Sequence, residues 1–192
     1  MRASRRFSQA ISEGDGISLL ARVGGPDDAR AAERAGAEGL VASTAHEDLR
    51  AATELPILWP SDALDEAEAV GADACVVAVD GLDDDGGRVE ALVAAASDRG
   101  LECVVRVSDE DELRLALDRL DPEVFLLSAH DVEAHDALEH VLGLLPDVPA
   151  GKLAIAELDV RVREEVAELE RAGVDAVVVR AADVAPLLGE PV

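Results

Sequence analysis

Seven polar residues stand at or just beyond the ends of short apolar runs, and their types suit the binding of a small anion. They are Arg22, Asp80, Arg106, Ser128, His130, Glu157 and Arg180. Guanidinium groups bind carboxylates through paired, charge-assisted hydrogen bonds, and a glutamate among cations can move a proton. The set predicts an anion pocket in which Glu157 is the one candidate catalytic residue, while the arginines, the serine and the histidine bind the ligand.

The same residues also fit an internal network of ion pairs. In that interpretation Glu157 and Asp80 neutralise the arginines, because charges enclosed by a narrow closed sheet must be paired. We favour this network over an open pocket.

The residues offer little support for a metal site or for a nucleophilic serine. His130 is followed by Asp131 and His46 follows Ser43-Thr44, but His135 and His140 lie five apart on an expected helix and do not share a face. No serine stands beside a placed histidine and acid. We expect no metal and no cofactor.

These residues must be positioned by eight apolar runs that are continuous, as in parallel strands covered by helices. The runs are Ile17–Val23, Gly39–Thr44, Pro56–Trp59, Ala74–Asp80, Glu102–Val107, Val124–Ala129, Leu153–Leu158 and Ala176–Arg180. Polar, alanine-rich segments separate them. Eight strand–helix units predict one compact (β/α)8 (TIM) barrel domain over residues 1–192, although such barrels typically need about 250 residues.

The helices predicted between the runs differ in length. The fuller ones are Asp27–Ala35, Ser61–Val70, Gly86–Asp98, a helix capped by Ser108–Asp111 and running to Arg119, Val132–Leu144 and Val160–Ala172. Ser61 or Asp62 is the expected cap of the second of these. The helices after the second and eighth strands are shortened or missing, and within residues 1–15 a short helix at Arg6–Ser12 is expected to close the barrel floor.

The composition limits the partners. The net charge is −25, with 42 acidic and 17 basic residues, and only one of the basic residues is a lysine, Lys152. Nucleic acid and anionic membranes should repel such a surface. High-salt adaptation and GC-rich coding both explain the acidic, lysine-poor composition. No run is long enough to span a membrane and no signal peptide is seen, so a cytoplasmic protein is expected, with Cys75 and Cys103 as buried reduced thiols.

Several segments carry a resemblance to a known family. They are Phe7–Ile11 before the first run, Leu55–Leu58 followed by Ala67–Val77, Glu102–Leu113 and Glu164–Val179. From Phe7 to Val192 the chain resembles indole-3-glycerol phosphate synthase, a phosphate-binding barrel of tryptophan biosynthesis. The resemblance implies a carboxy-lyase that closes a ring with loss of a carboxylate.

The residues that the family uses for this reaction are mostly replaced. The family's Ala-Glu-X-Lys at the end of the first strand reads Ala21–Gly24, and its lysine general acid after the third strand reads Trp59–Ser61. Its fifth-strand glutamate corresponds to Arg106. Its sixth-strand asparagine pair has become Ser128-Ala129 and its eighth-strand Gly-Glu has become Arg180-Ala181. Only Glu157 is kept.

The phosphate site is expected to be lost as well. Asp159 and Asp183 stand after the seventh and eighth strands, where glycine amides should bind phosphate, and they would repel it. Lys152 starts the seventh run, at the opposite end of the barrel from the catalytic face.

Three function classes follow. The first is a degenerate barrel, a pseudoenzyme, that serves as a scaffold or binds a small anion. The alternative is a lyase or isomerase of altered chemistry that uses Glu157 with Arg22 and Arg106 on an anionic substrate. The third is an oligomeric module, in which apolar strand flanks left uncovered by the short helices are covered by a second copy; a monomer or a homodimer is expected.

Overall fold

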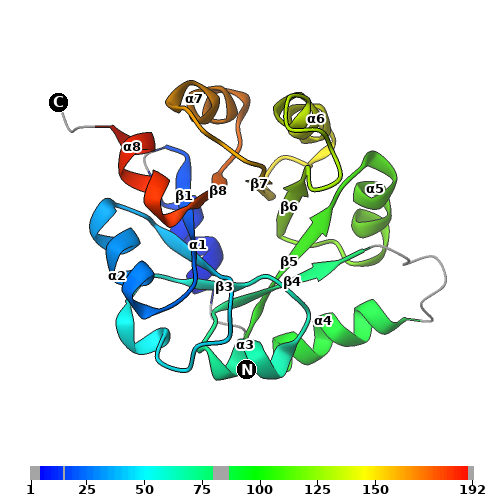
Figure 1. The fold of residues 1–192 in the computed structure, drawn as a ribbon. Helices are drawn as coiled ribbons and strands as arrows, with labels where there is room; N and C mark the ends of the chain where they lie inside the picture. The colour runs from blue at the N-terminus through cyan, green and yellow to red at the C-terminus, as the bar shows by residue number, and fades with distance from the viewer. Residues whose placement is uncertain (1–4, 15, 80–86, 190–192) are drawn as a thin grey trace.

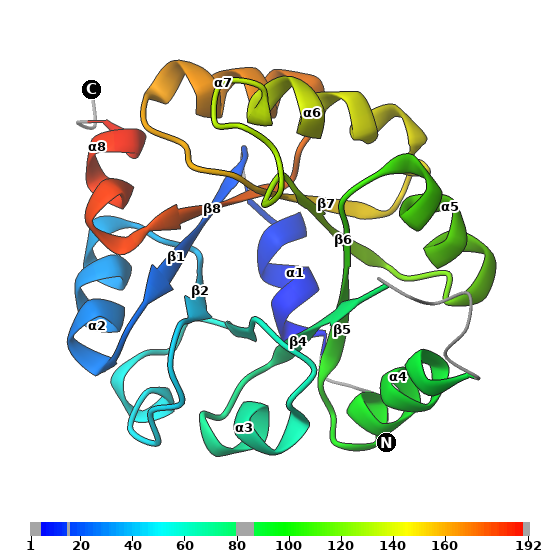
Figure 2. The ribbon, with the colours of Figure 1, turned by 45° about the vertical axis from the view of Figure 1, so that its right-hand side comes forward.

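The computed structural model describes residues 5–14, 16–79 and 87–189 and shows a closed barrel of eight parallel strands (Figures 1 and 2). Each strand pairs with the next, and β1 pairs with β8 to close the sheet. This confirms the predicted (β/α)8 barrel. The strands are β1 Ser18–Val23, β2 Gly39–Ala42, β3 Ile57–Trp59, β4 Ala74–Ala78, β5 Glu102–Val107, β6 Val124–Ser128, β7 Leu153–Glu157 and β8 Ala176–Arg180.

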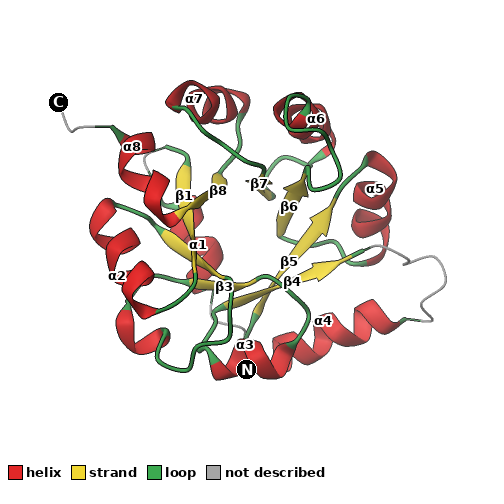
Figure 3. Ribbon diagram, viewed as in Figure 1, coloured by secondary structure: helices red, strands yellow, loops and turns green. Residues whose placement is uncertain are grey.

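Helices surround the barrel, as the secondary-structure colouring shows (Figure 3). They are α1 Arg6–Ser12, α2 Pro26–Ala35, α3 Leu64–Ala69, α4 Arg88–Asp98, α5 Glu110–Arg119, α6 Ala137–Leu144, α7 Arg163–Ala172 and α8 Val184–Leu188. A single 3-10 turn, η1 Arg50–Ala52, stands after β2, and α8 has only five residues. The shortened helices expected after these two strands are confirmed.

Helix boundaries differ from the prediction where loops leave the strands. The α3 helix begins at Leu64 rather than Ser61, and neither Ser61 nor Asp62 is its cap: Ala63 holds that position, and the Ser61 hydroxyl accepts a hydrogen bond from the Ala63 amide at 3.3 Å. The starts of α6 and α7 are also later than expected, at Ala137 and Arg163. Short-range turn bonds, such as the Val132 amide to the Ala129 carbonyl, replace the first predicted turn of α6.

Side-chain alternation along the strands separates two cores. One set of buried residues, including Leu20, Val104 and Ile155, lies inside the barrel, and a larger set packs between the sheet and the helices. Phe7 and Ile11 of α1 are buried with the interior set, so α1 lies against the floor of the barrel (Figure 2).

A carboxylate inside the floor holds α1 in place. Glu102, the first residue of β5, accepts hydrogen bonds from the amides of Phe7 at 2.7 Å and Ser8 at 3.2 Å. These are amides of the first turn of α1, whose orphan donors favour a negative charge. Burial raises the pKa of Glu102 above its usual range, although these hydrogen bonds oppose the rise.

The expected uncovered strand flanks are not there, so that part of the oligomer hypothesis is wrong. The outward residues Leu40 and Ala42 of β2 are fully buried, and Val179 of β8 is 4% exposed. Leu49, just before η1, is 1% exposed and takes the place of a full helix as apolar cover. Within the described residues, no helix has the length and apolar character needed to cross a membrane.

Candidate functional site

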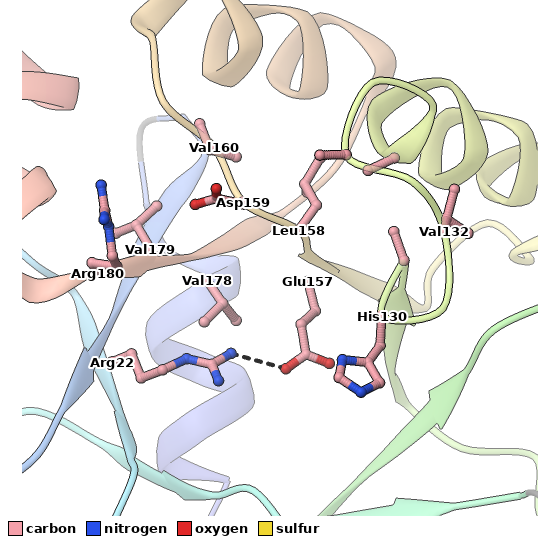
Figure 4. Close-up of a pocket in the computed structure, with 13 residues that line it drawn as sticks. Arg22, His130, Val132, Glu157, Leu158, Asp159, Val160, Val178, Val179 and Arg180 are labelled. Atoms are coloured by element: carbon pink, nitrogen blue, oxygen red, sulfur yellow. Dashed lines mark hydrogen bonds and ion pairs between the residues drawn. The ribbon is translucent and has the colours of Figure 1, made fainter.

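A pocket of about 390 Å³ opens at the carboxyl ends of β6, β7 and β8, with Arg22 of β1 on its far side (Figure 4). Its polar lining consists of Arg22, His130, Glu157, Asp159 and Arg180. Loop residues such as Val132, Leu158 and Val160 form an apolar wall. This is the end of a (β/α)8 barrel at which enzymes of this fold place their active sites.

Alternation along the strands explains why these residues gather there. Leu20, Leu126, Ile155 and Val178 face the barrel interior, and side chains two residues further along a strand point to the same side. The residues at those positions are Arg22, Ser128, Glu157 and Arg180, and Arg106 follows the interior residue Val104 in the same way.

Glu157 is held by two neighbours. Its Oε1 accepts a hydrogen bond from Arg22 Nη2 at 3.0 Å (Figure 4). Its Oε2 accepts one from the Ser128 hydroxyl at 3.1 Å. Ser128 is 1% exposed, whereas the side chains of Arg22 and Glu157 are 47% and 23% exposed. Of the ion-pair network that the sequence favoured, the structure shows the Arg22–Glu157 pair, and this pair stands beside an open pocket.

Arg180 points away from that cluster. Its Nε donates to Asp183 at 2.6 Å, and its side chain is 69% exposed (Figure 4). Asp159 similarly accepts from Arg161 at 2.7 Å. The two acids expected to repel an anion are therefore each paired with an arginine. Arg161 was missed by the sequence reasoning, and its spacing of two from Asp159 was the available signal.

Two further candidates make no hydrogen bond to the ion pair. His130 lines the pocket and is exposed, and no hydrogen bond joins it to another residue in the part of the chain described. Arg106 is half-buried on β5, and its side chain has no ion-pair or hydrogen-bond partner among the described residues. Asp80, expected to neutralise an arginine, lies outside the described residues.

Lysine chemistry is absent from the described mouth. Lys152 precedes β7 at the opposite end of the barrel, where its Nζ pairs with Asp121 at 2.7 Å. Among the residues that the structure describes, no group of three or more histidine, cysteine or acidic side chains is arranged to hold a metal ion.

Comparison with known proteins places the chain in a family. Residues 58–183, more than half of the chain, match the family model described as indole-3-glycerol phosphate synthase. The chain belongs to the indole-3-glycerol phosphate synthase family. Two relatives described as indole-3-glycerol phosphate synthase, from two strains of Acidithiobacillus ferrooxidans, are each 35% identical to it over 135 residues. The match covers 68% of this chain but 51% of each relative, so the chain spans about half the length of these synthases.

A solved structure shows the same fold at low sequence identity. Phosphoenolpyruvate phosphomutase from Streptomyces platensis subsp. rosaceus superposes with a TM-score of 0.65 and is 18% identical, with 92% of this chain and 80% of that chain covered. This likeness concerns the fold alone. The function of this chain must therefore be inferred from the residues at the mouth of its own barrel.

Proposed function

We propose that this member of the indole-3-glycerol phosphate synthase family does not catalyse ring closure and instead binds a small anion at the barrel mouth. One observation carries the proposal. Glu157 has both carboxylate oxygens engaged by Arg22 and Ser128, while the side chain of Arg106 has no ion-pair or hydrogen-bond partner among the described residues. The mouth thus offers guanidinium groups and no lysine.

The missing lysine argues against the family's reaction. Ring closure onto a carbonyl needs a cationic acid that gives up its proton, and a guanidinium stays protonated at any working pH. Lys152, the single lysine of the sequence, is at the far end of the barrel and is tied to Asp121. It therefore has no route to a substrate in the mouth.

Anion binding can use the arginines that remain at the mouth of the barrel. Arginine binds carboxylates and phosphates with two parallel hydrogen bonds, and this geometry suits Arg22 at the edge of a pocket of about 390 Å³. The Arg22 guanidinium is exposed enough to exchange Glu157 for a ligand oxygen. Arg106, two residues after the interior residue Val104 of β5, is a further cation on the inward side of the barrel, although it does not line this pocket.

An enzyme of altered chemistry is the second candidate, because Glu157 stands at the pocket. In this role Glu157 would take a proton from an anionic substrate held by Arg22 and Arg106. Both carboxylate oxygens of Glu157 already accept hydrogen bonds. To take a proton from a substrate, Glu157 would have to give up its bond to Arg22 or to Ser128. We therefore rank it below anion binding.

Calorimetric titration with acetate, succinate and inorganic phosphate tests the proposal. Arg22→Met should weaken binding by about ten-fold or more, since a hydrogen bond to a charged group contributes about 1.5–3 kcal/mol. Arg106→Met should weaken it by a smaller factor, because Arg106 does not line the pocket. Arg30→Met, which removes an exposed arginine of α2 paired with Asp27, is the matched control and should bind as the parent does.

A genetic test addresses the lost reaction. The gene should not restore growth of a tryptophan auxotroph that lacks indole-3-glycerol phosphate synthase, provided that the protein is expressed. Growth would overturn the proposal, and so would the absence of heat and of protection from unfolding with every anion of the panel.

A further inference from the structure

The two cysteines stand side by side on the outer wall of the barrel. Cys75 of β4 and Cys103 of β5 are partners in the parallel register of these two strands. Each alternates with interior residues, such as Val76 and Val104, so both thiols point away from the barrel interior. Neither cysteine lines the pocket at the mouth of the barrel.

One thiol is accessible and the other is not. A groove of about 650 Å³ lies between α4 and the loop after α5, and Cys103 is part of its lining together with Val93, Ser97 and Leu120. Cys103 is half-buried, whereas Cys75 is fully buried and does not line the groove. A small molecule in the groove therefore meets Cys103 first.

We propose that this pair is an oxidation site for small hydroperoxides, in which Cys103 reacts with the oxidant and Cys75 resolves the product as a disulfide. The site is independent of the anion pocket and lies towards the opposite end of the strands.

The surroundings of the two sulfurs support this order. The neighbouring Cys103 sulfur raises the pKa of Cys75, and burial raises it further. The neighbouring Cys75 thiol lowers the pKa of Cys103, whose own thiol lies 4.0 Å from the Val93 carbonyl oxygen. The thiolate is the reactive form, so the accessible cysteine is also the more nucleophilic one.

The chemistry balances with a hydroperoxide as the oxidant. The Cys103 thiolate attacks the peroxide oxygen, the O–O bond breaks, and a sulfenic acid and an alkoxide or hydroxide form. Cys75 sulfur then attacks the sulfenic sulfur; the S–O bond breaks, the S–S bond forms, and the thiol proton leaves with the oxygen as water. Two thiols are oxidised and one peroxide is reduced to an alcohol, or to water if the peroxide is hydrogen peroxide, with a second water from the sulfenic oxygen.

Strand geometry makes this disulfide easy to reduce. Parallel strands lie about 4.8 Å apart, which also sets the Cβ spacing of a register pair. A relaxed disulfide needs a Cβ spacing of about 3.5–4.5 Å, so closing the bond strains it, and strained disulfides are reduced more readily.

Charge selects the class of oxidant. Asp121 and Glu123 line the same groove beside a single cation, Arg5, in a protein whose net charge is −25. An anionic oxidant such as glutathione disulfide is repelled by so acidic a protein, whereas a neutral hydroperoxide is not. Hydrogen peroxide should therefore oxidise the pair faster than glutathione disulfide at equal concentration and low salt.

The test is treatment of the native protein with hydrogen peroxide, followed by intact mass, thiol counting and fluorescence. The expected product has lost two hydrogens, has no titratable thiol after denaturation, and returns to the starting mass with dithiothreitol. Trp59, the only tryptophan, is the register partner of Cys75 on β3 and should lose emission as the disulfide forms nearby. Two free thiols after treatment, or a Cys103 sulfinic acid beside a free Cys75, would overturn the proposal.

Single variants test the order of the steps. In Cys75→Ser the Cys103 sulfenic acid should persist and be trapped by dimedone. In Cys103→Ser, oxidation of Cys75 should slow by more than about ten-fold, because a buried thiol reacts only after local opening. Equal rates for the two variants would refute the assigned roles. Cys75→Ala and Cys103→Ala, with unfolding curves of all four variants, separate this result from loss of the fold.

Discussion

At the scale of single residues, Glu157 competes with any ligand for Arg22. Arg22 Nη2 is 3.0 Å from Glu157 Oε1, and the two side chains are only partly buried. Partly exposed ion pairs of this kind contribute little to stability, about 0–1 kcal/mol. The pair therefore sets the charge that the pocket presents more than it stabilises the barrel.

Replacing Glu157 by glutamine should strengthen anion binding. Glu157→Gln removes the charge that occupies Arg22 but keeps an acceptor near Ser128, so affinity for succinate should rise about three- to ten-fold, equivalent to about 1 kcal/mol. The free energy of unfolding should change by less than about 1 kcal/mol. Calorimetry and urea unfolding measure the two quantities.

The matched control is Glu123→Gln. Glu123 is also paired with an arginine, Arg5 at 2.7 Å, but near the barrel floor. It changes the net charge equally and should leave affinity unchanged. An equal gain in both variants would mean that overall charge, and not release of Arg22, controls binding.

The sequence could predict which residues reach the mouth but not how they pair there. Their places at the ends of the apolar runs correctly put Arg22 and Glu157 at the mouth of the barrel. A long side chain can reach several acids, and Arg180 pairs with Asp183, three residues further along the chain. Such local choices depend on loop conformation, for which a strand pattern carries no signal.

At the scale of elements, the connection after β2 shows how a barrel survives without a full helix. Arg50 in η1 donates to Asp73 Oδ2 at 3.0 Å and to the carbonyls of Thr53 and Leu55 at 2.5 and 2.7 Å. Asp73 in turn accepts from the Ile57 amide at the start of β3. One side chain thus ties the irregular segment after β2 to two strands.

Arg50→Met should lower the free energy of unfolding by about 2–3 kcal/mol. Methionine keeps the aliphatic stem but leaves the carbonyls of Thr53 and Leu55 without this donor, and Asp73 keeps only the Ile57 amide and Arg6. A polar group stranded in this way costs about 1–3 kcal/mol. Urea unfolding measures the loss. Arg30→Met, in an exposed pair on α2, should cost less than about 0.5 kcal/mol, and equal losses in both variants would contradict the role of Arg50.

The same connection marks what sequence reasoning could not resolve. The short segment correctly predicted a reduced helix after β2, yet uncovered apolar strand flanks were expected and Leu40 is fully buried. The expectation assumed that only a helix covers a strand. Leu49 is buried in the segment after β2, and a periodic pattern cannot predict a single buried residue in a loop.

At the scale of the whole molecule, the charge is the least balanced property. The 42 acidic residues face 17 basic ones, and many of the basic ones form surface ion pairs such as Arg30 with Asp27. Several acids, among them Glu47, Asp118, Glu164 and Glu168, are exposed. Like charges spread over a small barrel repel one another and oppose the compact state.

Salt should therefore stabilise this barrel, which also separates the two explanations of its composition. Raising sodium chloride from about 0.15 M to about 1 M shortens the screening length from about 8 Å to about 3 Å, so the repulsion is largely removed. The Tm should rise, by about 2–4 °C for each kcal/mol gained in a chain of this size.

A matched variant with four fewer charges should show a smaller rise in Tm with salt and a higher Tm at low salt. It combines Glu47→Gln, Asp118→Asn, Glu164→Gln and Glu168→Gln. A Tm that does not change with salt in the parent would show that the acidity is not an adaptation to high salt, and would favour coding bias as its origin.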